Sequence, residues 1–280
     1  MISPSVVTGC LSLTTDCGAR ASQNDDTQAF LLCQARLAMA GGCVIIPEGD
    51  YQVMGVPLNT SHIHWRFSSG AVVRPFHGYV TDVDYKDLFI IGATDSTGEN
   101  VLRRNATPVD QLVPARNISF TGPADNYVFI DNSKPIVCPW PVRAVRFGTV
   151  TNFTIANVKV LMANNHTNPA LPCPGTRPSL GMDHGPDAGS PSHGRVENIT
   201  ALDGWPGYGL IQIQSATYVH FENLDSTGGV TLRMETGGDN GFVGNITANK
   251  LICRNGSTAL MAGAHAQQNG VCKYPCSHLD

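Results

Sequence analysis

Short apolar runs separated by Gly, Asn, Asp and Pro recur along most of this chain, and two of them carry polar side chains at every second position. Within residues 230–235 the alternation puts three polar side chains on one face: Thr231, Arg233 and Glu235. Within residues 207–214 it puts Gln212 and Gln214 on a common face. An ordinary exposed strand would alternate in the same way. Two consecutive strands with aligned polar faces favour the floor of a groove.

A loose repeat of the form Asn-apolar-Thr marks the start of several of these runs. Related tetrapeptides begin at four positions: Asn152, Asn198, His220 and Asn245. Their offsets of 46, 22 and 25 residues correspond to two coils, one coil and one coil of roughly 23 residues each. A β-sandwich would instead place hairpin turns about every 8–12 residues. The chain is therefore predicted to be all-β, a single domain over residues 1–280 that forms a single-stranded right-handed parallel β-helix.

The N-terminal segment predicts a cap for this β-helix, over about residues 10–53. Asp25 and Asp26 precede a helical pattern with four apolar positions: Phe30, Cys33, Leu37 and Ala40. Gly41 and Gly42 end the helix, and residues 43–53 follow as strand, turn and strand. This arrangement resembles the N-terminal segment of pectate-lyase-like right-handed β-helices. A short helix there would cover strand edges and core that water would otherwise reach.

One long segment, residues 164–194, breaks the rhythm of strands and turns. It holds six prolines together with Asp183, His184, Asp187 and His193. A structureless stretch of this length is typically functional or disordered. The Asp and His side chains would suit a metal site, but a polar loop lying over the groove explains them equally simply and is the interpretation we favour.

Composition narrows the possible functions. A net charge of -4 argues against nucleic-acid binding, and no apolar run reaches the length of about 18 residues that a membrane span needs.

Nine scattered cysteines predict disulfides formed in an oxidising compartment, with at least one cysteine left over. Eight N-x-S/T sequons predict glycosylation: Asn59, Asn105, Asn117, Asn152, Asn165, Asn198, Asn245 and Asn255. Some of these sequons would also arise from the Asn-apolar-Thr repeat. We expect a secreted, extracellular protein whose targeting signal lies outside these residues, because no signal peptide is visible.

Several polar groups would converge if coils of about 23 residues stack: Gln212, Gln214, Arg233, Glu235, Asp239 and His265. A carboxyl group beside an amide, a guanidinium and an imidazole suits acid–base chemistry on a sugar. Inverting glycosidases hold two carboxyl groups about 6.5–9.5 Å apart, with a water between one of them and the sugar.

The motifs GYGLIQ, NLDSTGG with LRMET, and GAHAQQNG in residues 207–270 resemble the iota-carrageenases, glycoside hydrolase family 82. This resemblance implies a right-handed β-helix that cleaves sulfated galactans with inversion. It implies that Glu235 is the proton donor, that Gln212 helps to hold the water or an anion, and that His265 contacts the substrate. The family places its catalytic Asp two residues after the Glu, where this chain has Gly237. Asp239 is then either the displaced base or an ordinary turn residue.

Three functions follow as hypotheses. The first is a secreted hydrolase of an anionic polysaccharide, with Glu235 and Asp239 as acid and base. The second is a non-catalytic β-helix glycoprotein with a structural or carbohydrate-binding role, and the third is a polysaccharide lyase. The expected partner is a polysaccharide, with self-assembly compatible with the fold. No cofactor is required, although a bound calcium or chloride ion would fit. Few basic residues follow position 194, which favours a lightly sulfated ligand: Arg195, Arg233, Lys250, Arg254 and Lys273.

Overall fold

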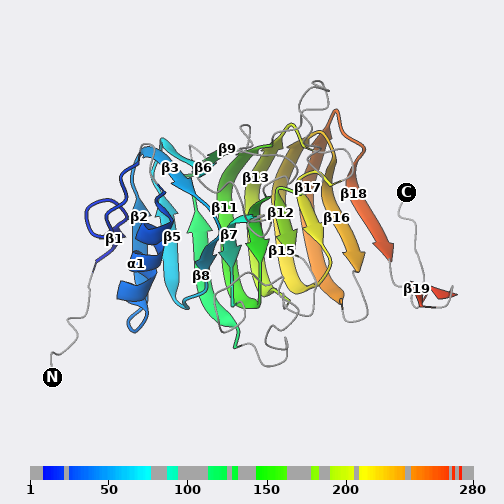
Figure 1. Ribbon diagram of the computed structural model, residues 1–280. Helices are drawn as coiled ribbons and strands as arrows, with labels where there is room; N and C mark the ends of the chain where they lie inside the picture. Colours follow the sequence, from blue (N-terminus) through cyan, green and yellow to red (C-terminus); the bar gives the residue numbers. More distant parts are fainter. Residues whose placement is uncertain are drawn as a thin grey trace.

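Parallel strands stack coil upon coil along most of the molecule (Figure 1). The computed structural model describes residues 9–21, 25–76, 87–93, 113–124, 128–131, 143–162, 178–182, 190–204, 208–236, 241–264, 267–268 and 271–272. Among these residues, β19 (Gln267–Gln268) and β20 (Val271–Cys272) form the antiparallel pair, and the other strand pairs are parallel. The predicted fold, a right-handed parallel β-helix, is confirmed.

The larger sheet, here called sheet A, follows the order β1-β2-β5-β8-β11-β13-β15-β17. These strands span Leu11–Ser12, Gly42–Ile46, Ile63–Phe67, Ala115–Thr121, Val150–Leu161, Ser192–Leu202, Ala216–Thr227 and Val243–Arg254. Three further strands extend it: β3 (Gly49–Val53), β6 (Ala71–Pro75) and β9 (Val128–Asp131).

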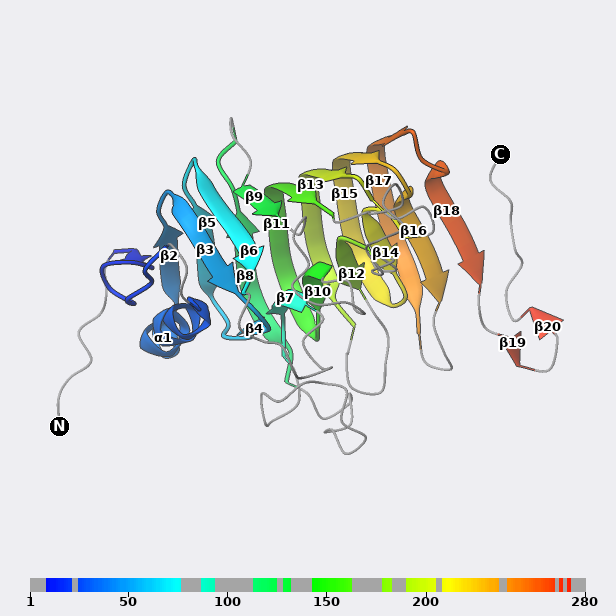
Figure 2. The same cartoon turned by 45° about the horizontal axis from the view of Figure 1, so that its top comes forward.

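The second sheet, sheet B, lies against sheet A across the core (Figure 2). Its order is β4-β7-β10-β12-β14-β16-β18. These strands span Val56–Leu58, Asp87–Ile91, Arg143–Phe147, Leu180–Met182, Ile211–Ile213, Val230–Thr236 and Thr258–Ala264. From β11 onward each coil contributes one strand to each sheet, whereas each earlier coil contributes two strands to sheet A, such as β2 and β3, and one to sheet B.

The helix α1 (Thr27–Leu37) closes the N-terminal end, as predicted. Phe30 on α1 packs 5.5 Å, between ring centroids, from Trp65 of sheet A and from Phe89 of sheet B. The helix ends at Leu37, so the prediction that Ala40 lies on its apolar face is wrong, and Ala40 is exposed. Because the helix is anchored to both sheets, it shields the first coil from water.

Carboxylates and disulfides hold this cap in place. Asp25 accepts a hydrogen bond from the Thr27 backbone N–H at 2.9 Å, whereas buried Asp26 accepts from the backbone of Arg20 and Gln52. Two disulfides lie here: Cys10–Cys43 and Cys17–Cys33. Cys253 is a free, half-buried thiol. The side chains of the remaining cysteines lie outside the described ones: Cys138, Cys173, Cys272 and Cys276.

The repeated Asn residues occupy backbone positions with positive φ angles, but the predicted alignment of Asn152 with Asn198 two coils apart is wrong. Strand β11 pairs directly with β13, with Phe153 opposite Gly194, so Asn152 lies in line with His193 rather than two coils from Asn198. Asn198 donates instead to the side chain of Asn157, 41 residues earlier, at 2.9 Å. These residues have positive φ angles, a conformation that Asn tolerates better than most residues. Asn therefore recurs where the long strands of sheet A bend.

The interpretation of residues 164–194 as a loop is wrong in part. Residues 180–182 form β12 of sheet B, and β13 begins at Ser192. Residues 163–177 and 183–189 lie outside the described part of the chain, with Asp183, His184 and Asp187 among them. Within the described residues, no helix is long and apolar enough to cross a membrane.

Candidate active site

The candidate site is built on β14 and β16, which lie side by side in sheet B. Ile211 and Ile213 are fully buried in the core, so Gln212 between them faces the other way. Arg233 is the register partner of Gln212 on β16. Glu235 follows two residues later and therefore lies on the same face as Arg233. The alternation of each strand and the stacking of one coil on the next bring these three side chains together.

The Glu235 carboxylate is held from two sides. Gln212 Nε2 donates a hydrogen bond to Glu235 Oε2 at 3.1 Å, and Arg233 forms an ion pair with the other oxygen, Oε1. The Arg233 guanidinium also lies 4.7 Å from the centre of the Tyr208 ring, a cation–π contact. The Glu235 side chain is 5% exposed and that of Arg233 15% exposed. A buried carboxylate is stabilised in its charged form by such donors, so the cluster fixes the position and the orientation of Glu235.

Thr231 does not belong to this face, contrary to the prediction. Its hydroxyl donates to the Ile252 carbonyl of sheet A at 2.8 Å and shares a hydrogen bond with Ser226 at 2.8 Å. Thr231 is fully buried, so it ties the two sheets together at the start of β16 instead of lining a groove.

The other predicted site residues are placed in part. Gln214 follows β14, is half-buried and donates its backbone N–H to the Met182 carbonyl at 2.8 Å. Asp239 and His265 lie in residues 237–240 and 265–266, outside the described part of the chain. The structure therefore positions the predicted acid and the predicted amide, and it assigns no position to the predicted base or to the histidine.

In this cluster the Glu235 carboxyl group is held by two donors, the Gln212 amide and the Arg233 guanidinium. That carboxyl group can exchange a proton with a bound sugar if the sugar oxygen replaces one of its present partners. The guanidinium is suited to an anionic substituent, because sulfate and carboxylate groups accept paired N–H bonds from Arg.

Comparisons with known proteins find relatives that match along nearly all of this chain. The chain is 29% identical over 273 residues to an iota-carrageenase of Zobellia galactanivorans, covering 92% of this chain and 48% of that protein. An iota-carrageenase of Alteromonas macleodii matches at 29% over 272 residues, with the same coverage. The crystal structure of the family GH82 iota-carrageenase from A. fortis superposes with a TM-score of 0.74 at 25% identity, covering 94% of this chain and 51% of that one. The chain is iota-carrageenase-like. It spans about half the length of the curated relatives it matches, and no family model matches it.

Within this iota-carrageenase-like chain, sequence reasoning missed Tyr208 and Arg146. Tyr208 lies in the GYG motif, where its aromatic ring was a signal for a stacking role. Arg146 interrupts an apolar strand, β10, between Val145 and Phe147. Its register neighbour is Gly181, which in turn pairs with Gln212, and only the stacking of coils reveals this connection.

Sequence reasoning also missed a buried ion pair beside these strands. Arg143 Nε lies 2.6 Å from Asp87 Oδ1, and the two residues are register partners on β10 and β7. Their side chains are 3% and 6% exposed, so the pair belongs to the interior of the β-helix.

Metal binding finds no support among the described residues, where no three His, Cys, Asp or Glu side chains converge. His193, from the predicted Asp/His cluster, stacks on Tyr218 with ring centroids 4.8 Å apart. Both residues have positive φ angles, at equivalent bends of β13 and β15. In its described position, His193 therefore serves as a stacking partner of Tyr218.

Three of the predicted glycosylation sites donate their side-chain amides within the fold. Asn152 donates to Asn117, Asn198 to Asn157, and Asn117 contacts His62 Nδ1 at 2.9 Å. Asn59, Asn245 and Asn255 are also described, whereas Asn105 and Asn165 are not. A glycan attached to the side-chain amide of Asn117, Asn152 or Asn198 would displace the hydrogen bond that this amide makes.

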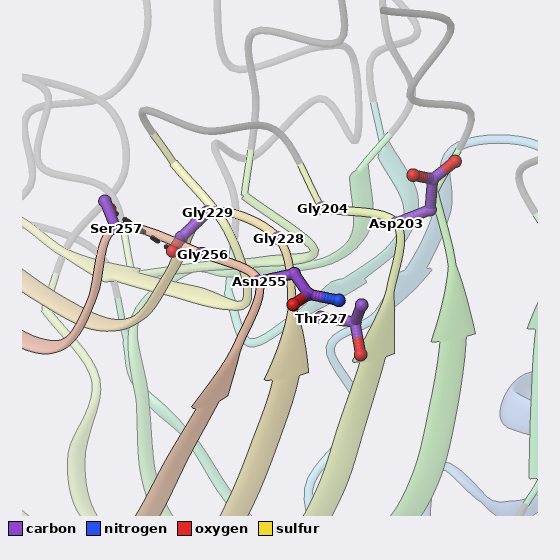
Figure 3. A pocket seen from close by; sticks show the side chains of 8 residues that line it. All are labelled: Asp203, Gly204, Thr227, Gly228, Gly229, Asn255, Gly256 and Ser257. Carbon is purple, nitrogen blue, oxygen red and sulfur yellow. Dashed lines mark hydrogen bonds between the residues drawn. The ribbon is translucent and has the colours of Figure 1, made fainter. Parts of the chain in front are cut away.

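A cavity of about 530 Å³ lies at the opposite end of β16 from Glu235 (Figure 3). It is lined by the turns that follow β13, β15 and β17: Asp203, Gly204, Thr227, Gly228, Gly229, Asn255, Gly256 and Ser257. The carboxylate of Asp203 points away from the amide of Asn255 in Figure 3. These side chains do not converge, so the cavity reflects closely stacked glycine turns rather than a second chemical centre.

Proposed function

We propose that this protein is a secreted glycoside hydrolase that cleaves a sulfated polysaccharide with inversion at the anomeric carbon. The observation that carries the proposal is the Glu235 carboxylate held by Gln212 and Arg233 on an iota-carrageenase-like β-helix. The chain's relatives are iota-carrageenases, and a similar crystal structure, with a TM-score of 0.70, is that of an iota-carrageenase complexed to iota-carrageenan fragments.

In the proposed reaction, Glu235 donates its proton to the glycosidic oxygen as the bond from that oxygen to the anomeric carbon breaks. A water molecule attacks the same carbon from the opposite face and loses its proton to a base. Asp239 is the candidate base, with Gln212 orienting groups around the acid and with His265 and Gln214 contacting the sugar. Glu235 is left ionised after each turnover and regains its proton from solvent.

Arg233 links substrate binding to this proton transfer. The ion pair between Arg233 and Glu235 stabilises the ionised carboxylate, which is the wrong form for a proton donor. A sulfate group of the substrate would compete for the guanidinium, because Arg binds such anions with paired hydrogen bonds. The ion pair between Arg233 and Glu235 would then weaken as the substrate arrives.

A non-catalytic β-helix with a carbohydrate-binding or structural role is the second candidate. The observation that favours it is the low exposure of the Glu235 side chain, 5%, together with its ion pair. A carboxylate buried in this way can also serve only to hold two strands of sheet B together.

The test is a reducing-end assay on iota-carrageenan with the wild-type protein and with Glu235→Gln, combined with NMR of the first product formed. Hydrolysis that Glu235→Gln abolishes, with an inverted anomer, is the expected result. Binding of the polymer without cleavage would favour the non-catalytic candidate, and a product of retained configuration would overturn inversion. Secretion is part of the proposal because the two cap disulfides need an oxidising compartment.

A further inference from the structure

The strand that follows the candidate site, β18, carries a glycine beside the proposed acid. Glu235 on β16 is the register partner of Gly263 on β18, and Arg233 is the register partner of Met261. The two strands lie side by side in sheet B (Figure 2). Because register partners on neighbouring strands face the same way, a side chain at position 263 would stand beside Glu235, one strand spacing of about 4.8 Å away.

Neither the backbone nor the packing requires a glycine at position 263. The φ angle of Gly263 lies outside the left-handed region, and no atom of the described residues lies within 4 Å of the point that a Cβ would occupy. Other strand glycines have a structural reason. Gly42 and Gly49 have φ angles of +139° and +155°, and a Cβ on Gly194 or Gly244 would clash with an aromatic ring.

A glycine inside a strand weakens that strand, because it has no side chain to pack and loses more conformational freedom on folding than other residues. It often marks a bulge or a place where a ligand approaches the backbone closely. The pairing of β16 with β18 continues without a break from Leu232 to Thr236, so Gly263 marks no bulge. Gly263 is also exposed, which leaves the approach of a ligand as its explanation.

The groups that hold Glu235 come from the preceding coil and from its own strand. Gln212 donates to the carboxylate from β14, and Arg233 forms its ion pair from β16. Met261 and Gly263 come from the following coil, and neither has a side chain that donates a hydrogen bond to a carboxylate. The Met261 side chain is 38% exposed and apolar. Because the Glu235 side chain is only 5% exposed, bulk added beside it would hinder a ligand.

We infer that Gly263 determines which ligands reach Glu235, by leaving the space through which a sugar unit of the substrate approaches the carboxyl group from the side of β18. This inference rests on the proposed function, which supplies the polysaccharide and the acid. The sugar ring lies over the backbone of Gly263, with Met261 as its apolar neighbour. A side chain at position 263 would fill this volume and move the glycosidic oxygen away from the proton donor.

The first experiment compares the wild type with Gly263→Ala, Gly263→Val and the control Ala248→Val, all in the full chain. Ala248 is an exposed residue of β17, in the same coil but on sheet A. A reducing-end assay on iota-carrageenan gives kcat/KM, and thermal unfolding gives Tm.

We expect kcat/KM to fall about 100-fold in Gly263→Val, because a misplacement of about 1 Å can cost about that factor, and to fall less in Gly263→Ala. Tm should stay the same or rise in both variants, because Ala and Val destabilise a strand less than Gly does. Ala248→Val should keep the wild-type kcat/KM. Lower activity without lower stability separates hindrance of the substrate from damage to the fold.

A second experiment locates the sugar directly. Gly263→Cys and Ala248→Cys are each combined with Glu235→Gln, which keeps the polymer intact, and with Cys253→Ser, which removes the free thiol of β17. Alkylation of each introduced thiol is followed by mass spectrometry of the peptide that contains it. With iota-carrageenan at about ten times its Kd, we expect alkylation at position 263 to slow about tenfold and alkylation at position 248 to stay unchanged.

Wild-type kcat/KM in Gly263→Val would overturn the inference, and so would alkylation at position 263 that the polymer does not slow. A lower Tm together with lower activity, without protection at position 263, would assign Gly263 a structural role and would also overturn it. Each of these results can occur in an active hydrolase. If the wild type releases no reducing ends from iota-carrageenan, the proposed function itself fails, and the inference fails with it.

Discussion

Gln212 and Glu235 lie 23 residues apart in the sequence and meet on neighbouring strands, where the Gln212 amide donates to the Glu235 carboxylate at 3.1 Å. One turn of the β-helix between β14 and β16 is 21 residues, from Gln212 to its register partner Arg233, so Glu235 lies two residues further along the same face and diagonally across from Gln212. The same carboxylate also forms an ion pair with Arg233. Glu235 is therefore positioned by strands of two successive coils rather than by one flexible loop.

Replacement of Glu235 by Gln should remove most of the hydrolytic activity. An amide cannot donate the proton that the leaving oxygen needs, and general acid catalysis typically contributes about 10²–10⁴-fold. The rate of new reducing ends from iota-carrageenan measures this loss. Glu222→Gln on sheet A is the matched control and should leave the rate unchanged. Activity close to the wild-type rate in Glu235→Gln would exclude Glu235 as the acid.

Removal of the Tyr208 ring should disturb Arg233 without touching the carboxyl group. The stacking contact at 4.7 Å is lost in Tyr208→Ala and kept in Tyr208→Phe. We expect kcat/KM for iota-carrageenan to fall about tenfold in Tyr208→Ala, in line with a cation–π contribution of about 1–2 kcal/mol. Tyr208→Phe should stay within about twofold of wild type, since each 1.4 kcal/mol corresponds to a tenfold change. Equal losses in both variants would point to the hydroxyl group instead of the ring.

The buried pair of Asp87 and Arg143 should matter for stability. Asp87→Asn removes the buried ion pair with Arg143, and breaking such a pair typically costs about 3–5 kcal/mol of the free energy of unfolding. Replacing both residues together, with Asp87→Leu and Arg143→Met, should cost much less, because both charges of the pair then leave the interior. Urea denaturation of the three proteins gives these values. A double variant as unstable as Asp87→Asn would show that the pair contributes more than charge balance.

Asp26 should make the stability of the cap depend on pH. Burial raises the pKa of Asp26 above its ordinary value of 3.8, against the lowering effect of backbone N–H donors. A raised pKa means that the folded protein favours the protonated form, so this contribution is present below the ordinary pKa and is lost as pH rises through the folded pKa. We expect the stability of wild type relative to Asp26→Asn, measured by urea denaturation, to fall as pH rises above the ordinary pKa of 3.8. A difference that stays constant as pH rises would contradict the sign.

The cap disulfides should contribute to stability through the loops that they close. Cys10–Cys43 and Cys17–Cys33 span 33 and 16 residues, for which loop closure predicts about 3.7 and about 3.1 kcal/mol respectively. The variant Cys17→Ser with Cys33→Ser should lower Tm, with both residues replaced so that no unpaired thiol remains. Cys253→Ser, at a free thiol, is the control and should change Tm little. An unaltered Tm in the double variant would mean that the cap adds nothing to global stability.

Features of the fold that depend on residues close together in the sequence could be predicted from the sequence. Alternation placed Arg233 and Glu235 on one face, and the spacing of apolar residues placed α1 on the first coil through Phe30. Thr231 departed from the alternation because sheets A and B converge at the start of β16, where its hydroxyl reaches the Ile252 carbonyl. Such a contact depends on the distance between two sheets, which no local pattern records.

By itself, the sequence determined the β-helix, its capped end and the coil that joins Gln212 to Glu235, because these depend on short-range periodicity. Only the tertiary structure decided the alignment of Asn198 with Asn157 and the alignment of Arg146 with Arg233. Neighbours in sheet A are separated by 25 residues between Asn198 and Asn223 but by 41 between Asn157 and Asn198. Hydrogen bonding between strands sets the register, whereas turn length varies freely at the surface, so spacing along the chain cannot identify which residues meet.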